Sequence, residues 1–267
     1  MGLYDRDYTQ EPTPDEIDEY KAVSKQEVSK DGRRIGRVNM PHLYPEAIRH
    51  HQSLFPNYHV DLISTKMNPD FDNINKGFLD LLDNPETHEQ LILNYIKSSK
   101  AYHIPMSILR AGGFLVGNHG SYLFPEFELG QSYRADYLLV GKNSGGYQFI
   151  FVEFENPYNH IVLKDGELGE TFRKGITQVK SWSRWLEKHY SSLIEFWSKN
   201  ALQALPNEFV TYDSTNIHFV VVAGRRSNFN AETYRLRREY QKEQNITLLH
   251  YDNLYDAACK VKQYSSF

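Results

Sequence analysis

The feature of the sequence that most constrains the fold is the nearly all-apolar stretch YQFIFVEFE, residues 147–155. If this stretch is a β-strand, alternation places Glu153 and Glu155 on the same face as Phe149 and Phe151, with mostly large apolar side chains on the other face. Bulky apolar side chains on both faces are typical of a strand that is covered on both sides. Two carboxylates at the end of such a strand cost free energy unless a cation or hydrogen bonds compensate for their burial.

The residues around this strand predict an antiparallel meander. Strand-forming stretches at 112–130 and 133–141 precede residues 147–155, and turn-forming clusters occur at 117–120 and 142–146. Adjacent strands of a meander lie side by side, so residues near a shared end of two strands are expected to lie close together.

Beyond the acidic strand the pattern alternates between helices and strands. Residues 169–190 carry an apolar stripe at helical spacing, which predicts a helix packed against the sheet. The later elements are predicted as a strand at 216–224, a basic helix at about 230–244, a strand at 246–251 and a short helix beginning near Asn253. This order predicts an α/β fold, a mixed β-sheet flanked by helices.

Three regions are expected along the chain. Residues 1–40 are rich in charge and poor in apolar side chains, which predicts a flexible acidic N-terminal arm outside the core. Residues 41–104 show helical periodicity in pieces and are expected to cover or precede the sheet. Residues 105–267 are expected to form the main domain.

The composition is that of a soluble globular protein. The chain has 267 residues, 40% of them hydrophobic, and no apolar run approaches the ~20 residues that a membrane span needs. The acidic N-terminus lacks the features of a signal peptide, so a cytoplasmic location without membrane contact is expected. The single cysteine, Cys259, excludes an intrachain disulfide and is expected to be a small buried apolar residue.

The charge is distributed unevenly. The net charge is -4, and residues 1–20 carry seven acids against one arginine, which leaves the remainder at about +2. Residues 220–245 are rich in arginine, including Arg225, Arg226 and Arg235. These residues would form either a phosphate-contacting surface for DNA or an ordinary solvated helix face, and the sequence leaves both open.

A third acid is expected beside the two glutamates. Asp136 lies on the preceding strand, 17 positions before Glu153, across a glycine-containing turn. Strands in an antiparallel pair are ~4.8 Å apart, so Asp136, Glu153 and Glu155 could reach one hard divalent cation. Ligands that are all oxygen select Mg²⁺ or Mn²⁺ over zinc, and such an ion commonly binds substrate phosphates. The pattern therefore indicates phosphodiester chemistry.

At this point the sequence resembles a known family. An aspartate followed after a hairpin by E-x-E is similar to the PD-(D/E)XK nuclease signature. More narrowly, residues of about 105–260 resemble the nuclease domain of the Shedu family of bacterial anti-phage proteins. The resemblance rests on five blocks in order, EFELGQSYRADYLLVG, FIFVEFENP, DGELGETFRKGITQVKSWSRWL, HFVVVAGRR and ITLLHYDNL.

The resemblance implies a restriction-endonuclease-like core, a DNA substrate, Mg²⁺ or Mn²⁺ as cofactor and assembly as a homo-oligomer. It also implies that Asp136 and Glu153 are metal ligands. Glu126 would be the upstream acid of the active site, with Glu128 as its competitor. Gln178 matches the glutamine of the family's helix motif.

The sequence departs from the signature where Glu155 stands in place of lysine. Glu155 would then serve as a ligand or a base, and an amine could also come from elsewhere. Lys174, one helical turn before Gln178, could donate to the scissile phosphate, and Lys164 in the preceding loop is the second candidate.

The sequence thus predicts a metal-dependent DNA endonuclease acting in phage defence. Two other hypotheses remain open. One is a degenerate module of the same fold that binds or senses nucleic acid without cutting it. The other is a protein-interaction component whose acidic strand end binds a basic partner.

Overall fold

A five-stranded mixed β-sheet forms the centre of the computed structural model. The structure describes residues 2–26, 28–29, 31–33, 53–114, 116–117, 120–159, 161–163, 167–264 and 267. The strand order follows the sequence, and the strands are β1 (Ser121–Leu129), β2 (Tyr133–Asn143), β3 (Gly146–Phe154), β4 (Ile217–Val222) and β5 (Ile246–Leu249).

The first three strands form the predicted antiparallel meander, and β4 and β5 continue the sheet in parallel to β3. The turn between β2 and β3 falls within the predicted cluster at 142–146. The other predicted turn, at 117–120, precedes β1 instead of following it, and the β1–β2 turn lies at residues 130–132. Gly130 supports that turn with a backbone φ of +60°, which favours glycine.

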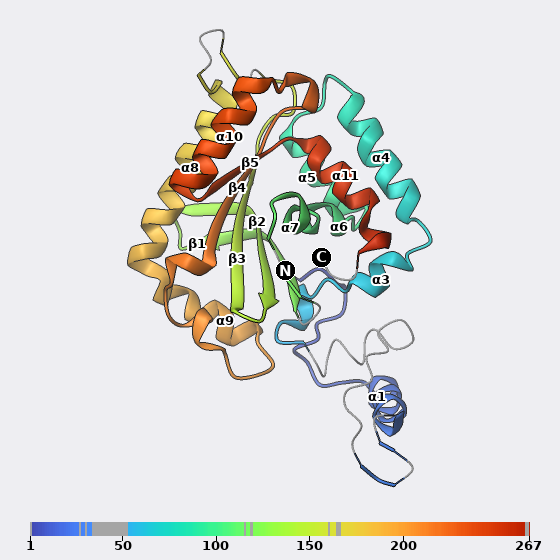
Figure 1. The fold of residues 1–267 in the computed structure, drawn as a ribbon. Coiled ribbons are helices and arrows are strands. Elements are labelled where there is room, and N and C mark those ends of the chain that lie inside the picture. The colour runs from blue at the N-terminus through green and yellow to red at the C-terminus, as the bar shows by residue number, and fades with distance from the viewer. Residues whose placement is uncertain are drawn as a thin grey trace.

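Helices cover both faces of the sheet (Figure 1). One face packs against α8 (Glu170–His189), α9 (Ile194–Asn200) and α10 (Ala231–Gln244). The other packs against α4 (Phe71–Asp83), α5 (Glu89–Ser98), α6 (His103–Met106), α7 (Ile108–Ala111) and α11 (Tyr251–Cys259). Two further helices, α1 (Pro14–Gln26) and the short α3 (Leu62–Lys66), lie nearer the N-terminal end of the chain. The predicted α/β architecture is confirmed.

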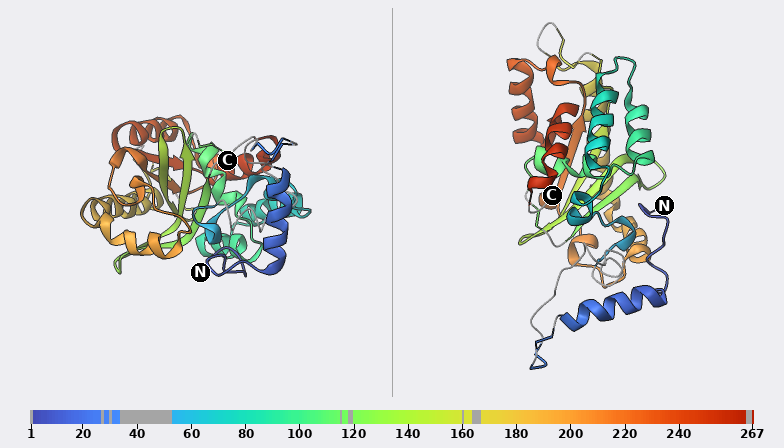
Figure 2. Two further views of the ribbon diagram at one scale, coloured as in Figure 1. Left: turned by 90° about the horizontal axis from the view of Figure 1, so that it is seen from below. Right: turned by 90° about the vertical axis from the view of Figure 1, so that its right-hand side faces the viewer.

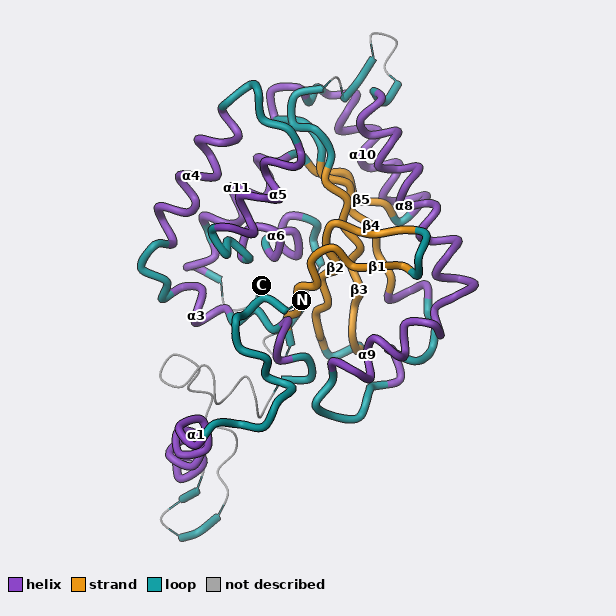
Figure 3. The backbone as a smooth tube through the Cα atoms, turned by 180° about the vertical axis from the view of Figure 1, so that it is seen from behind, coloured by secondary structure: helices purple, strands orange, loops and turns teal. Residues whose placement is uncertain are grey.

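The alternation predicted for the acidic strand is also confirmed. Phe149 and Phe151 are buried against the α8 side of the sheet, whereas Ile150, Val152 and Phe154 are buried against the α4 and α11 side. Both faces of β3 are therefore inside the protein, as its composition predicts. The tube in Figure 3 shows the strands from behind, enclosed by helices on either side.

The crossovers from β3 to β4 and from β4 to β5 use helices close to the predicted ranges. The predicted helix at 169–190 is α8 and the predicted basic helix is α10. The C-terminal helix α11 begins at Tyr251, two residues before its predicted start. Its N-cap is His250, whose ring nitrogen accepts a hydrogen bond from the backbone N–H of Asn253, a role more often filled by Ser, Thr or Asp.

The N-terminal segment only partly matches the expected arm. Helix α1 projects from the body of the protein (Figures 1 and 2). The residues before it are attached to the body, because Leu3 is buried in the core and its N–H donates to the carbonyl of Asn57. The expectation of an arm outside the core is thus wrong for Leu3. Residues 34–52 lie outside the described part of the chain.

Two further features bear on the sequence predictions. Cys259 is exposed near the end of α11, so the expectation that it is buried is wrong.

The helices on the α11 face share one hydrophobic core with the sheet. This core joins the region at 53–104 to the strands. Within the described ranges, no helix combines the length and the apolar character needed to cross a membrane.

Candidate active site

The two glutamates lie at the C-terminal end of β3, on the side of the sheet that α8 covers. Their exposed fractions are 4% for Glu153 and 3% for Glu155. Glu155 follows the last residue of the strand, and its backbone is held from two directions. Its N–H donates to the carbonyl of Val222 at 2.8 Å, and its carbonyl accepts from the hydroxyl of Tyr251 at 2.8 Å. The side chain of Glu155 therefore leaves a backbone that has little freedom to move.

Asp136 lies beside them at the same level of the sheet. The regular β2–β3 pairing ends at Tyr137 and Val152, so the next pair in register would be Asp136 and Glu153. The backbone N–H of Phe154 donates to the carboxylate of Asp136 and not to a backbone carbonyl, with an N–O distance of 2.7 Å. The hairpin thus brings the three predicted acids to one end of two adjacent strands.

A lysine from α8 reaches this acidic end. Lys174 Nζ lies 2.9 Å from Glu155 Oε2 and 3.9 Å from Glu89 Oε2, at the first residue of α5. The helix can approach closely because its next residue is Gly175, where an added Cβ would lie 2.5 Å from Val221 and 3.3 Å from Glu155 Cγ. Gly175 therefore allows α8 to lie close to the strand end, where the side chain of Lys174 contacts the acids.

The described residues around these carboxylates do not provide hydrogen-bond donors for all of their buried oxygens. Among the described residues, Glu153 Oε2 and Glu155 Oε1 are buried without a hydrogen-bond partner. Burial and the neighbouring acids Asp136 and Glu155 hold the pKa of Glu153 well above its ordinary value. Burial, the charge of Glu89 and that of Glu155 likewise raise the pKa of Asp136, against the opposing hydrogen bond from Phe154. A buried acidic group of this kind is stabilised in its charged form by a nearby cation or by hydrogen bonds.

The donor chemistry of these residues fits a hard divalent ion. All available donors are carboxylate oxygens, and two of the buried ones have unused lone pairs. Within the described ranges, however, no three acidic, histidine or cysteine side chains are already gathered into a metal-binding group. The residues therefore offer the right ligands without a preformed cage.

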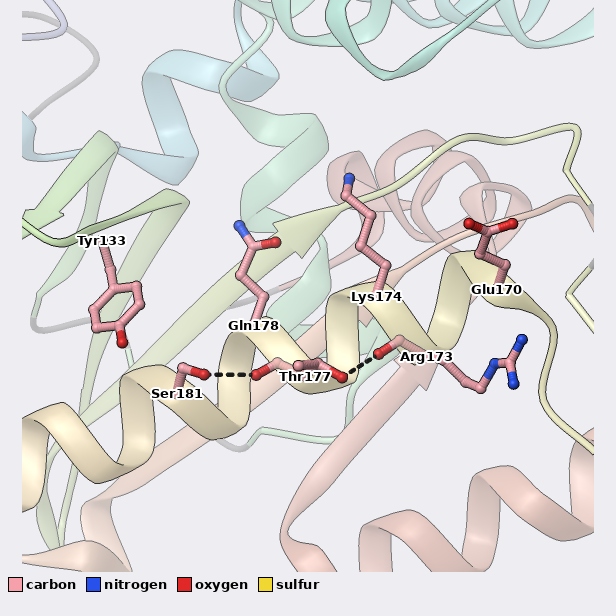
Figure 4. A pocket seen from close by; sticks show the side chains of 7 residues that line it. All are labelled: Tyr133, Glu170, Arg173, Lys174, Thr177, Gln178 and Ser181. Carbon is pink, nitrogen blue, oxygen red and sulfur yellow. Dashed lines mark hydrogen bonds between the residues drawn. The ribbon is translucent and has the colours of Figure 1, made fainter.

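An open pocket lies next to this strand end (Figure 4). Its volume is about 440 Å³, and one exposed flank of α8 forms most of its wall. The lining residues are Tyr133, Glu170, Arg173, Lys174, Thr177, Gln178 and Ser181. Lys174 and Gln178 both rise from α8 on the side of the strands, as their spacing of one helical turn predicts.

Glu126 occupies a different environment from the three acids above. It lies on β1 opposite Asp136, but its positive φ of 48° interrupts the pairing at that position. Its carboxylate is exposed and forms ion pairs with Arg134 at 3.3 Å and Lys97 at 4.0 Å. Glu128, its competitor, is an exposed residue of the same strand. A further acid, Glu89, lies 3.9 Å from Lys174 Nζ.

Glu89 could not have been selected from the sequence. It is the acid in the first turn of α5, and only the packing of α5 against the sheet brings it to Lys174. Gly175 and Tyr133 were missed for the same reason, because their partners belong to distant segments. The only sequence signal for Gly175 was the presence of a glycine within a stretch of helical periodicity.

The predicted phosphate-binding arginines are already engaged within the protein. Arg225, whose side chain is 13% exposed, donates to Asp252 and to Asp83 Oδ1, the latter at 2.9 Å. Arg226 pairs with Asp256. Arg235 pairs with two glutamates of its own helix, Glu232 and Glu239. Lys164 lies outside the described residues.

The comparison with protein families identifies the chain's relatives. No curated protein matches the sequence. The family model described as "Shedu protein SduA, C-terminal" matches residues 50–255, which include the whole sheet, α8 and the acids Asp136, Glu153, Glu155 and Glu89. The match covers most of the chain, and the resemblance noted in five sequence blocks is confirmed. The chain belongs to the Shedu SduA C-terminal family.

Proposed function

We propose that the protein is a divalent-metal-dependent DNA endonuclease of the PD-(D/E)XK type that acts in bacterial anti-phage defence. The observation that carries this proposal is the strand end at which Glu153 and Glu155 are buried with unused oxygens beside Asp136. Membership of the Shedu family supports the defence role. Assembly as a homo-oligomer remains a prediction that follows from the family.

Asp136, Glu153 and Glu155 would hold Mg²⁺ or Mn²⁺. When bound, such an ion neutralises phosphate charge, lowers the pKa of an attacking water and stabilises the leaving oxygen. The protein supplies the rigid frame, because the backbone on both sides of Glu155 is held by hydrogen bonds from β4 and α11. The cost of burying these acids is then offset by the charge they bind.

Lys174 takes the position of the amine that the family signature places on the acidic strand. Its Nζ contacts Glu155 Oε2 at 2.9 Å, and its side chain is still 58% exposed to the pocket. It can therefore hold the glutamate and donate to a phosphate oxygen of the substrate. Gln178, one turn further along the same flank, would orient the strand that is cut.

The direct test is a plasmid digest with purified protein. We expect cleavage or nicking in Mg²⁺ or Mn²⁺ and none in EDTA, since carboxylate ligands supply no positive charge of their own. Activity that persists in EDTA would refute the metal mechanism. Binding of Mn²⁺ by calorimetry without any cleavage would favour the degenerate binding module, and absence of both would favour the protein-interaction hypothesis.

The same assay decides which acid completes the site. Glu89→Gln is expected to reduce cleavage by roughly 10-fold or more, because it removes a carboxylate that faces Lys174 next to the metal ligands. Glu126→Gln should have a smaller effect, because Glu126 forms exposed ion pairs. The reverse order would restore Glu126 to the role that the sequence predicts for it.

A further inference from the structure

The pocket beside the acidic strand end has two different walls. One is the exposed flank of α8, and the other is Tyr133 at the start of β2. The β1–β2 turn is seated on α8 through Gly130, where an added Cβ would lie 2.9 Å from the ring of Trp185. This contact sets the separation between Tyr133 and the helix, so the pocket is part of the fold.

The helix wall carries one cation, Arg173, that no described residue neutralises. Five basic residues and two acidic ones lie on α8, a net charge of +3 for residues 170–189, whereas α10 has four against three, a net charge of +1. In the described structure the guanidinium of Arg173 has neither an ion pair nor a hydrogen bond. Arg235 on α10 differs, because two glutamates neutralise it.

Arg173 and Lys174 adjoin the acids from the same turn of α8. Lys174 contacts Glu155, and Arg173 lies on the outer side of that turn (Figure 4). An anion held by Arg173 would lie one residue along α8 from the lysine that contacts the acidic site. Glu170 is the one acid among the described residues that line the pocket, and it forms no ion pair with Arg173 there.

The opposite wall offers an aromatic surface. Tyr133 is 39% exposed, so its ring is accessible from the pocket that it lines. Its ring borders the same pocket as Arg173. A cation and an exposed ring across a pocket of about 440 Å³ match the two parts of a nucleotide, a phosphate and a base.

We propose that this pocket binds one nucleotide of the nucleic acid strand next to the site of cleavage, with its phosphate on Arg173 and its unpaired base stacked on Tyr133. The proposal rests on the proposed function, since it places the substrate strand along α8. A base can stack on a side chain only when it has left the helical stack, so the pocket selects a locally unpaired nucleotide. The arginines at the end of β4 and on α10 are not needed for this contact.

The test is binding of a short fluorescent oligothymidine, followed by anisotropy in EDTA so that no cleavage occurs. We expect Arg173→Gln to weaken binding by about 10-fold and to lower the slope of log affinity against log salt by about 0.7, the value for one phosphate contact on a single strand. Arg173→Lys should retain most of the affinity. Unchanged affinity and slope in Arg173→Gln would overturn the phosphate contact.

Tyr133 is tested in the same way. Tyr133→Ala should weaken oligothymidine binding by about 10-fold, and Tyr133→Phe should bind like the unmodified protein, because stacking needs the ring and not the hydroxyl. A duplex of equal length should bind with little dependence on Tyr133. Equal dependence for both probes, or none for either, would overturn stacking of an unpaired base.

The matched control is Lys199→Gln, which removes one exposed cation from α9 on the same side of the sheet but outside the pocket. Its affinity should be unchanged, and an equal loss there would show that only net charge matters. Melting temperatures establish that each variant folds. Binding that depends on Arg173 and Tyr133 without any metal-dependent cleavage would leave the pocket standing and refute the nuclease. Cleavage with binding indifferent to both residues would do the reverse.

Discussion

Two groups of buried charges lie at the ends of neighbouring parallel strands, and they differ in how well they are satisfied. At the end of β4, Arg225 is held by Asp252 and Asp83 and by the carbonyl of Leu82. At the end of β3, Glu153 and Glu155 keep buried oxygens without partners. Hydrogen bonds and ion pairs offset the cost of burying charged groups, whereas a buried acid without them is typical of a catalytic or ion-binding position.

The two groups also differ in the direction of their pKa shifts. Burial by itself would raise the pKa of Asp252, but the hydrogen bonds from Arg225 and from the N–H of Arg226 lower it. No comparable donor reaches Glu153, so burial and like charges raise its pKa. The arginine cluster therefore belongs to the structure, and the acidic cluster is free to act on something else.

The largest expected effect that would test this contrast is on activity at the acidic end. Glu153→Gln should lower the rate of DNA cleavage by roughly 10³-fold, because the amide lacks the charge that binds the cation. The free energy of unfolding without metal should stay equal or rise, since a buried acid is replaced by a neutral group. Plasmid cleavage and urea denaturation measure the two effects.

The control for that change is Glu187→Gln, at an exposed acid of α8 outside the pocket. It should leave both quantities unchanged. A large loss of stability in Glu153→Gln would contradict the contrast, because the glutamate would then be a structural residue like Arg225.

The next effect is on stability at the arginine end. Arg225→Met should lower the free energy of unfolding by about 3 kcal/mol, because it leaves the partly buried Asp252 without its partner. Arg226→Met, which breaks an ion pair between half-exposed side chains, should cost less than about 1 kcal/mol. Urea denaturation compares them, and equal effects would remove the structural role assigned to Arg225.

The histidine beside this arginine cluster should make stability depend on pH. Burial lowers the pKa of His250 to about 4, and its ring also faces Asp252, Asp256, Arg226 and Arg237. The folded state therefore binds the proton more weakly than the unfolded chain, whose pKa is near 6.5. The contribution of neutral His250 to the free energy of unfolding is complete above about pH 6.5. It is lost as the pH falls toward about 4, and the loss is about 2 kcal/mol at pH 5.

Denaturation curves recorded between about pH 7 and about pH 5, the approximate limits of the titration, measure this loss of stability. His250→Asn, which retains an acceptor at the helix N-cap, should remove the part of the slope that comes from His250, while His103, whose pKa burial also lowers to about 4, keeps its own part. A slope of the same size in that variant would assign the titration to other groups.

The smallest effect concerns the contact that joins α8 to the acidic strand. Gly175→Ala should cost about 1 kcal/mol, since crowding against Val221 exceeds the gain in helix propensity. Because the added carbon also presses on Glu155, cleavage should fall although no charged group changes. The double variant Gly175→Ala with Val221→Ala should recover part of the stability, and a silent Gly175→Ala would show that α8 can move without affecting the site.

The sequence alone determined the order and type of the main elements. The apolar strand at 147–155, the meander before it and the helix at 169–190 follow from side-chain periods of two and 3.6, which local backbone geometry imposes. The shared face of Glu153 and Glu155, and the place of Asp136 beside them, follow from the same alternation and one hairpin.

Only the tertiary structure decided which charged side chains form ion pairs within the protein. The sequence predicted Arg225 as a phosphate contact and Glu126 as an active-site acid, because a charge appears available when its partners are distant in the chain. Folding supplied Asp252 and Asp83 for Arg225, and it brought Glu89 to Lys174 from a helix 85 positions earlier in the chain (174 − 89). Pairing of charges depends on long-range packing, which local periodicity does not encode.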